Sequence, residues 1–209
     1  SLRGEDDNMR DEFLIFGSPL IGEAEINEVV DSLRSGWIGT GPKVARFEGM
    51  LAEYVGVAQA RCVSSCTAAL FLAMRCLDLG PGDEVLVPAL TFVATANAVE
   101  HTGATPVLVD SEPTGTGLMD LDAAEAAITP RTRAIVPVHL YGRPFDMDRL
   151  NALRDKYGLA VVEDAAHAIG ARWRGKPIGA FGNLTAFSFY PTKNITTIEG
   201  GALLTNDLD

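Results

Sequence analysis

The sequence predicts an α/β protein in which a mostly parallel sheet is packed between helices. Helical and strand-like patterns alternate along the chain from about residue 20 to the end. Several strand-like segments are short, continuous apolar runs, which are typical of a parallel sheet covered by helices on both faces. No apolar run approaches the roughly 18 residues of a membrane-spanning helix.

Six segments carry apolar residues with the 3.6-residue period of a helix. In the first of them, one stripe is formed by Ile26, Val29, Val30 and Leu33. The third is followed by residues 80–83, a Gly-Pro-Gly-Asp sequence that signals a turn. We expect helices at residues 23–35, 44–55, 67–77, 94–101, 121–128 and 146–157.

The apolar segments between these helices are predicted to be strands. Their expected ranges are 61–63, 84–88, 106–110, 134–138, 159–163, 185–189 and 202–205. Ligands of open α/β sheets bind beyond the carboxyl ends of the strands. The residues that follow each strand are therefore the candidates for a binding site.

Composition and charge exclude several classes of protein. The 209 residues include 17 basic and 28 acidic side chains, a net charge of −11, whereas nucleic-acid-binding proteins usually show a basic footprint. The three cysteines fit neither a disulfide framework nor a usual zinc spacing, which favours a reducing compartment. We expect a cytoplasmic protein that binds no nucleic acid, membrane or metal.

The two ends of the chain differ from the rest. Residues 1–12 are acidic and polar, unlike a signal peptide, and we expect them to form a flexible leader. At the other end, the chain stops at Asp209, just after the apolar strand pattern of residues 201–205. A turn follows this strand pattern with no further element after it, which suggests a longer parent protein.

Small hydroxyl residues follow the first strand, in the segment 64–67 that opens a helix. The free backbone N–H groups and the dipole of a helix N-terminus suit a phosphate group. An ordinary Ser/Thr helix cap also accounts for these residues. Both interpretations stay open on the sequence alone.

Three further candidates follow other strands. Phe92 stands near the carboxyl edge of the sheet, where its ring either stacks on a flat cofactor or belongs to the core. Asp164 follows a buried strand, where a carboxylate is costly unless it is paired with a cation or fully hydrogen-bonded; a helix cap is the alternative. His167, three residues later, either joins the same site or is structural.

Lys193 lies in a short loop after the strand at residues 185–189. A lysine in such a pocket can act as a nucleophile, whereas a plain surface lysine is the simpler explanation. Taken together, a phosphate anchor, a stacking ring, a buried carboxylate and a lysine at strand ends form the set that pyridoxal 5'-phosphate requires.

The sequence resembles the DegT/DnrJ/StrS family of pyridoxal-phosphate-dependent sugar aminotransferases from about Phe16 to its last residue. The segments that carry the resemblance are 35–38, 41–42, 64–70, 80–85, 91–92, 139–142, 163–167, 188–189, 193–194 and 199–201. So many ordered segments at compatible spacing are highly specific, although no single one would be.

The resemblance implies the aspartate aminotransferase (type I) fold. That fold has a large domain with a mostly parallel, seven-stranded sheet and a smaller C-terminal domain. On this basis residues 13–209 form the cofactor-binding large domain, and the small domain is missing from the chain.

The resemblance also implies the roles of individual residues. The expected catalytic residues are Lys193, which would hold the cofactor and move a proton, and Asp164, which would keep the pyridine nitrogen protonated. Phe92 would stack on the ring, and His167 would lie near its hydroxyl group. The phosphate would be bound by Cys66, Thr67, Ala68 and Ser188. Relatives often carry glycine in place of Cys66, whose Cβ could crowd the phosphate loop.

The implied reaction moves an amino group from an amino acid, glutamate, to a nucleotide-linked keto sugar in amino-sugar biosynthesis. Relatives with this chemistry are typically homodimers with shared active sites. Lys193 favours transamination, because some relatives carry histidine there and catalyse dehydration. The alternatives are a non-catalytic or regulatory family member, and a same-fold aminotransferase or dehydratase for another keto sugar or cyclitol.

Two segments outside this set have open interpretations. The glycine-rich loop at residues 36–41 either borders the substrate site or simply connects two helices. The dense basic cluster at residues 172–176 either attracts the anionic substrate or forms a solvated hairpin turn, and the hairpin is the simpler explanation.

Overall fold

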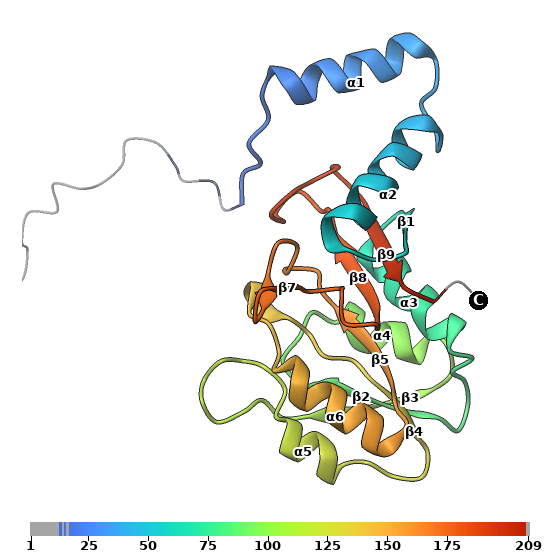
Figure 1. The fold of residues 1–209 in the computed structure, drawn as a ribbon, viewed down its shortest axis with the longest axis vertical. Helices are drawn as coiled ribbons and strands as arrows, with labels where there is room; N and C mark the ends of the chain where they lie inside the picture. The colour runs from blue at the N-terminus through green and yellow to red at the C-terminus, as the bar shows by residue number, and fades with distance from the viewer. Residues whose placement is uncertain (1–12, 14, 16, 208–209) are drawn as a thin grey trace, which may run out of the picture.

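A computed structural model describes residues 13, 15 and 17–207, and the leader expected at residues 1–12 lies outside the described residues. Its centre is a seven-stranded sheet with the strand order β1-β9-β8-β5-β4-β2-β3. Helices cover both faces of this sheet, giving three layers (Figure 1). The predicted α/β class is therefore confirmed.

The sheet is parallel except for one strand. Its strands are β1 (Gln59–Val63), β2 (Glu84–Pro88), β3 (Thr105–Val109), β4 (Thr132–Ile135), β5 (Ala160–Asp164), β8 (Leu184–Ser188) and β9 (Gly201–Thr205). β2 pairs parallel with β3 and β4, and β5 pairs parallel with β4 and β8. β9 runs antiparallel between β1 and β8. The carboxyl ends of the other six strands therefore share one edge.

The described residues form six α-helices, and all but the first pack on one face or the other of the sheet. They are α1 (Glu23–Ser35), α2 (Pro42–Val55), α3 (Cys66–Cys76), α4 (Ala94–Glu100), α5 (Leu121–Ala126) and α6 (Met147–Tyr157). Along β2, Val85 and Val87 pack with α3 and α4, whereas Leu86 packs with the layer of α2, α5 and α6. This is the two-residue period of a strand, and because both faces are covered, the strand is apolar throughout.

Local sequence explains where several helices begin and end. The side chains of Asp120 and Asp146 accept hydrogen bonds from the first turns of α5 and α6. Pro42 opens α2, where its missing N–H group costs nothing. α1, α2 and α6 end at glycines in the left-handed conformation, which are Gly36, Gly56 and Gly158.

Two segments show how tertiary pairing modified or confirmed the expected elements. The strand expected at residues 134–138 ends at Ile135, because Pro137 has no N–H group to continue the ladder. The basic cluster forms an antiparallel hairpin of β6 (Arg172–Trp173) and β7 (Lys176–Pro177), as the hairpin interpretation predicted.

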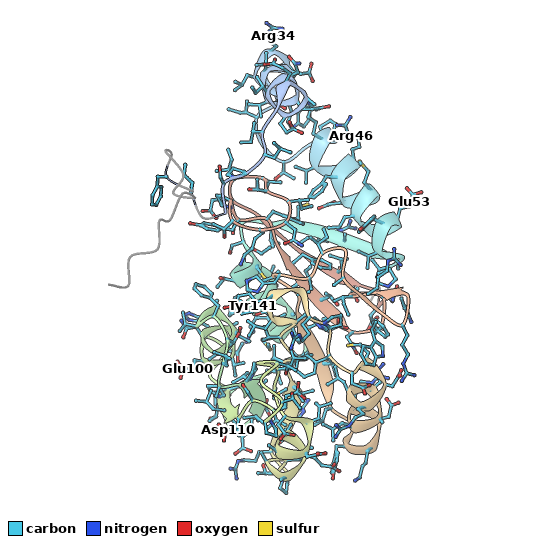
Figure 2. All side chains as sticks on the ribbon, turned by 90° about the vertical axis from the view of Figure 1, so that its left-hand side faces the viewer. Arg34, Arg46, Glu53, Glu100, Asp110 and Tyr141 are labelled. Atoms are coloured by element: carbon cyan, nitrogen blue, oxygen red, sulfur yellow. The ribbon has the colours of Figure 1, made fainter. Side chains whose placement is uncertain are left out.

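Helix α1 stands apart from the sheet. It buries no residue, and its apolar stripe stays exposed at Ile26, Val29 and Leu33. Figure 2 shows Arg34 at the far tip of the molecule, well away from the helices around the lower sheet. Within the described residues, no helix combines the length and the apolar character needed to cross a membrane.

Candidate active site

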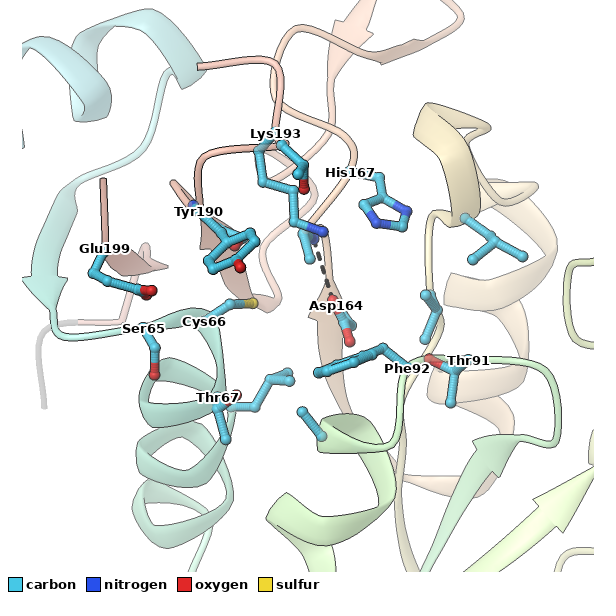
Figure 3. A pocket seen from close by; sticks show the side chains of 18 residues that line it. Ser65, Cys66, Thr67, Thr91, Phe92, Asp164, His167, Tyr190, Lys193 and Glu199 are labelled. Carbon is cyan, nitrogen blue, oxygen red and sulfur yellow. Dashed lines mark hydrogen bonds between the residues drawn. The ribbon is translucent and has the colours of Figure 1, made fainter. Parts of the chain in front are cut away.

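A cavity of about 410 Å³ opens at the carboxyl edge of the sheet (Figure 3). This volume is typical of a small-molecule site. Parallel strands bring its walls together, because residues far apart in sequence follow strands that end at the same edge. Seven of the eight site residues expected from the sequence line it, namely Cys66, Thr67, Phe92, Asp164, His167, Ser188 and Lys193.

Lys193 enters the cavity from the loop after β8. Its backbone N–H donates to the carbonyl oxygen of Tyr190 at 2.9 Å, which closes a tight turn. The side chain is half-buried and extends into the cavity (Figure 3). It is the only lysine or arginine among the described residues that line the cavity, so its amine is the cationic group available there.

Asp164 closes β5 and is only 4% exposed. Its Oδ1 accepts a hydrogen bond from the backbone N–H of Ala166 at 3.2 Å, and its Oδ2 accepts one from the hydroxyl of Thr95 at 2.8 Å. A carboxylate has about four lone-pair sites, so it can still accept a further donor from the cavity. The expected buried carboxylate is therefore present, hydrogen-bonded and open to a cationic partner.

His167 is oriented by the short turn at Leu140–Gly142. The backbone N–H of Tyr141 donates to Nδ1 of His167 at 3.1 Å, and the two rings stack with their centroids 5.6 Å apart. Because Nδ1 accepts this bond, the neutral imidazole carries its proton on Nε2. Burial, followed by the charge of Lys193, lowers the pKa of His167 below its ordinary value of 6.5. His167 is thus held as a neutral ring beside the cavity.

The N-terminus of α3 forms another wall. Ser65 caps the helix, and its Oγ accepts a hydrogen bond from the N–H of Ala68 at 3.1 Å. The first-turn N–H groups that remain without an intrahelical acceptor belong to Cys66 and Thr67. Ala68, although expected to bind phosphate, does not line the cavity. The structure therefore shows both a helix cap and a potential anion site at this N-terminus.

The thiol of Cys66 also faces the cavity (Figure 3). Burial, reinforced by the charge of Asp164, raises the pKa of this thiol well above its ordinary range, although Lys193 opposes the rise. The thiol is accordingly neutral at physiological pH. It contributes volume and weak polarity to the wall, with no negative charge against a phosphate.

Phe92 and Ser188 occupy two further sides. Phe92 is 73% exposed and lies across the cavity beside Asp164 (Figure 3), so its ring is free to contact a flat ligand. Ser188 ends β8 and is buried, and its Oγ accepts a long hydrogen bond of 3.5 Å from the N–H of Tyr190. The hydroxyl is therefore close to the lysine loop.

Some residues around the site are not among the site residues expected from the sequence. Thr95 lies in α4 and Thr91 in the loop before it, and their hydroxyl oxygens are 2.8 Å apart. The four-residue spacing is the only local hint. His139 and Glu163 are fully buried, with His139 Nε2 3.1 Å from Glu163 Oε2. His139 Nδ1 accepts from the N–H of Phe145, so Nε2 is the donor to Glu163 in the neutral ring.

The two segments with open interpretations lie outside the cavity. Residues 36–41 connect α1 to α2, and there Trp37 Nε1 donates to the carbonyl of Thr40 at 3.0 Å. In the basic hairpin, Arg174 pairs with Asp148 at 2.7 Å, and Lys176 lies over the ring of Phe181. Neither segment contributes to the cavity of this chain.

The residues of the cavity fit pyridoxal 5'-phosphate. Lys193 supplies an amine, Asp164 supplies a buried carboxylate for a protonated ring nitrogen, and the start of α3 offers free N–H groups for a phosphate. Among the residues that the structure describes, no three His, Cys, Asp or Glu side chains are grouped so that they could hold a metal ion.

Comparison with known proteins agrees with this assignment. SpsC of Bacillus subtilis, a spore coat polysaccharide biosynthesis protein, is 52% identical over 198 residues, which are 95% of this chain and 51% of SpsC. Spr1654 of Streptococcus pneumoniae, a candidate sugar aminotransferase solved in its PLP form, has a TM-score of 0.89 at 44% identity, over 93% of this chain and 53% of that one. DesV of S. venezuelae has a TM-score of 0.83 at 49% identity, over 89% and 49%.

The matches cover nearly all of this chain but only part of its relatives. The chain spans about half the length of the curated relatives it matches. The family match itself covers residues 19–209, nearly all of the chain. Together with the lysine and the buried aspartate of the cavity, this match shows that the chain belongs to the DegT/DnrJ/EryC1/StrS aminotransferase family.

Proposed function

We propose that the protein is a pyridoxal-phosphate-dependent aminotransferase that moves an amino group from an amino acid, glutamate, to a nucleotide-linked keto sugar. The observation that carries the proposal is the placement of Lys193 and Asp164 in one cavity with the open N-terminus of α3. SpsC, named for polysaccharide biosynthesis, and the sugar aminotransferase neighbour support a sugar acceptor.

The overall reaction balances as an exchange. The donor amino acid becomes its 2-oxo acid, and the carbonyl group of the keto sugar becomes an amine. When bound, the cofactor supplies the carbonyl carbon that carries the amino group and a ring that takes up the electrons of the cleaved C–H bond. The protein must therefore hold the ring, keep its nitrogen protonated and move one proton.

The described residues are suited to these tasks. The Asp164 carboxylate stabilises positive charge at a ring nitrogen, because a nearby opposite charge favours the protonated form. The amine of Lys193 is the proton carrier, and a positioned acid–base group of this kind contributes about 10²–10⁴-fold to the rate. His167 presents Nε2–H as a donor, since Nδ1 already accepts from the backbone of Tyr141.

The proposal includes a homodimer with shared active sites that acts in the cytoplasm. Large apolar side chains remain exposed at Phe92 in the cavity wall, at Tyr141 on the ring of His167, and along α1. Such exposed apolar surface marks contact with another polypeptide. Cys62, Cys66 and Cys76 are free thiols, which suits a reducing compartment.

The first test is cofactor binding. Pyridoxal phosphate is added to the purified protein, its absorbance spectrum is recorded, and borohydride reduction is followed by peptide mass mapping. We expect a visible absorbance band and a pyridoxyl group on Lys193. The variant Lys193→Ala should lose both, whereas Lys176→Ala, whose side chain lies on the ring of Phe181 in the hairpin, should keep both. Labelling spread over surface lysines would overturn the proposal.

The second test addresses the substrates. The loaded protein is mixed with glutamate and then with a panel of nucleotide-linked keto sugars, and the amino sugar is detected by mass spectrometry. Conversion of a nucleotide-linked keto sugar would support the proposed acceptor. Conversion of a cyclitol ketone alone would replace it with the same-fold alternative, and cofactor binding without any turnover would favour the regulatory alternative.

A further inference from the structure

We propose that Thr95 is a positioning residue for Asp164, and that the hydroxyl of Thr91 supports Thr95 by a hydrogen bond. Neither hydroxyl belongs to the set of residues expected to bind the cofactor. The inference rests on the proposed function, because it assigns a task to Asp164 in that site. It extends the proposed function by naming what holds the carboxylate in place.

The evidence begins with a chain of three side chains. The Thr95 hydroxyl donates to Asp164 Oδ2 at 2.8 Å. Since its hydrogen is used in that bond, its oxygen accepts from the hydroxyl of Thr91, which lies 2.8 Å away. The chain therefore runs from Thr91 through Thr95 to the carboxylate, and all its donors point the same way.

The three side chains of this hydrogen-bonded chain differ in whether they line the cavity. Thr95 is fully buried and does not line the cavity, whereas Thr91 and Asp164 do. Thr95 consequently acts on a bound ligand only through Asp164. Because a hydrogen bond in a poorly solvated site is stronger and neighbouring bonds polarise one another, the chain holds the carboxylate more firmly than one exposed hydroxyl would.

The backbone of Asp164 is fixed as well. Its N–H donates to the carbonyl of Pro137 at 2.9 Å, and its carbonyl accepts from the N–H of His139 at 3.0 Å. The side chain then has one donor on each oxygen, from Ala166 and Thr95. With the backbone and both oxygens held, the carboxylate has a single orientation toward the cavity. Removal of the Thr95 hydroxyl frees one oxygen and allows the group to rotate.

The chain offers a matched control for this idea. Thr185 is also fully buried, but its Oγ1 has no hydrogen-bond partner among the described residues. Replacing either threonine by valine removes a buried hydroxyl and keeps the shape of the side chain. Only the change at Thr95 removes a bond to a charged group, and hydrogen bonds to charged groups are the stronger class.

The test compares Thr95→Val with Thr185→Val in the whole protein. Three quantities are measured: the dissociation constant of pyridoxal phosphate, the pH midpoint of the absorbance change of the bound cofactor, and the melting temperature of the cofactor-free protein. We expect Thr95→Val to weaken cofactor binding about tenfold or more and to move the pH midpoint, while Thr185→Val changes neither. Thr95→Ser, which keeps the hydroxyl, should restore binding to within about threefold.

Further variants keep the test decisive if Thr95→Val does not fold. Thr91→Val removes only the outer link, so it should weaken binding by a smaller factor, and Thr95→Ser should again resemble the unchanged protein. Equal cofactor affinity and equal pH midpoints for Thr95→Val and Thr185→Val would overturn the inference and leave the proposed function standing. Failure of the unchanged protein to bind pyridoxal phosphate would instead overturn the proposed function, and the inference with it.

Discussion

Asp164 and His167 each accept a hydrogen bond from a backbone N–H group, and these bonds decide which part of each side chain faces the cavity. Ala166 donates to Oδ1 of Asp164, and Tyr141 donates to Nδ1 of His167. A backbone donor does not rotate as a hydroxyl does, so each side chain has one preferred state. At the scale of the residue, the site is set by these fixed donors as much as by the functional groups themselves.

The environment of His167 predicts how the stability of the protein depends on pH. Protonation of Nδ1 would break the bond from Tyr141, and burial together with Lys193 already lowers the pKa of His167. The unfolded chain therefore binds a proton more readily than the folded one. The contribution of His167 to stability is complete above about pH 6.5, its ordinary pKa, and is lost as the pH falls through its lower folded pKa.

The measurement is urea unfolding at pH 7.5 and pH 5. We expect His167→Gln to lose less stability between these two values than the unchanged protein does. His101→Gln is the control, since His101 is exposed and lies outside the cavity. An identical pH dependence for His167→Gln and the unchanged protein would contradict the assignment of a neutral His167.

At the scale of the element, the wall of the cavity depends on how closely β9 approaches α3. An added Cβ on Gly201, at the start of β9, would clash with the backbone N of Cys66 and with the carbonyl carbon of Ser65. Neither contact is with a flexible side chain. Glycine is needed here because backbone packs directly on backbone.

Gly201→Ala should therefore push α3 away from the sheet. We expect a loss of about 1–3 kcal/mol in the free energy of unfolding, the range typical of overpacked sites, and weaker binding of the cofactor phosphate. Urea unfolding and cofactor titration measure the two effects. Gly49→Ala, in open space on helix α2, should instead raise stability by about 0.5–1 kcal/mol. If Gly201→Ala leaves both the free energy of unfolding and cofactor binding unchanged, this close approach is not required.

At the scale of the whole molecule, the apolar surface is uneven. The sheet and five helices bury two extensive cores, whereas α1 leaves its stripe exposed. Polar contacts tie α1 to α2, with Lys43 close to both Glu28 and Asp31, at 2.7 Å and 2.9 Å. Surface ion pairs of this kind add little stability, so the apolar stripe is the part of α1 suited to a stable contact.

The proposed homodimer yields a prediction for this stripe. The double variant Val29→Asp/Leu33→Asp should shift the protein toward monomers in sedimentation velocity, because it places two charges on the apolar face. Leu108→Asp changes an equally exposed apolar residue on the edge strand β3 and should leave assembly unchanged. If both variants sediment as the unchanged protein does, α1 is not part of the dimer contact.

Much of the fold was predictable, because period and turn signals are local properties of a chain. α1 and β2 have the bounds that their apolar patterns predict. The strand expected at residues 134–138 was wrong at both ends, because β4 runs from Thr132 to Ile135. Its pairing partners and Pro137 together decide its length. The antiparallel direction of β9 has no local signal at all, because strand direction is a property of the pair and not of the segment.

The sequence alone determined the α/β class and the main chemical groups of the site, since Asp164 lies at the end of an apolar strand and Lys193 in the short loop after another, and the ends of both strands share one edge of the sheet. Only the tertiary structure decided what supports those groups. Thr95 is 69 residues from Asp164 in sequence, and Tyr141 is 26 residues from His167. Their hydrogen bonds depend on which strands become neighbours, and that choice follows from packing of the whole sheet, which no local pattern encodes.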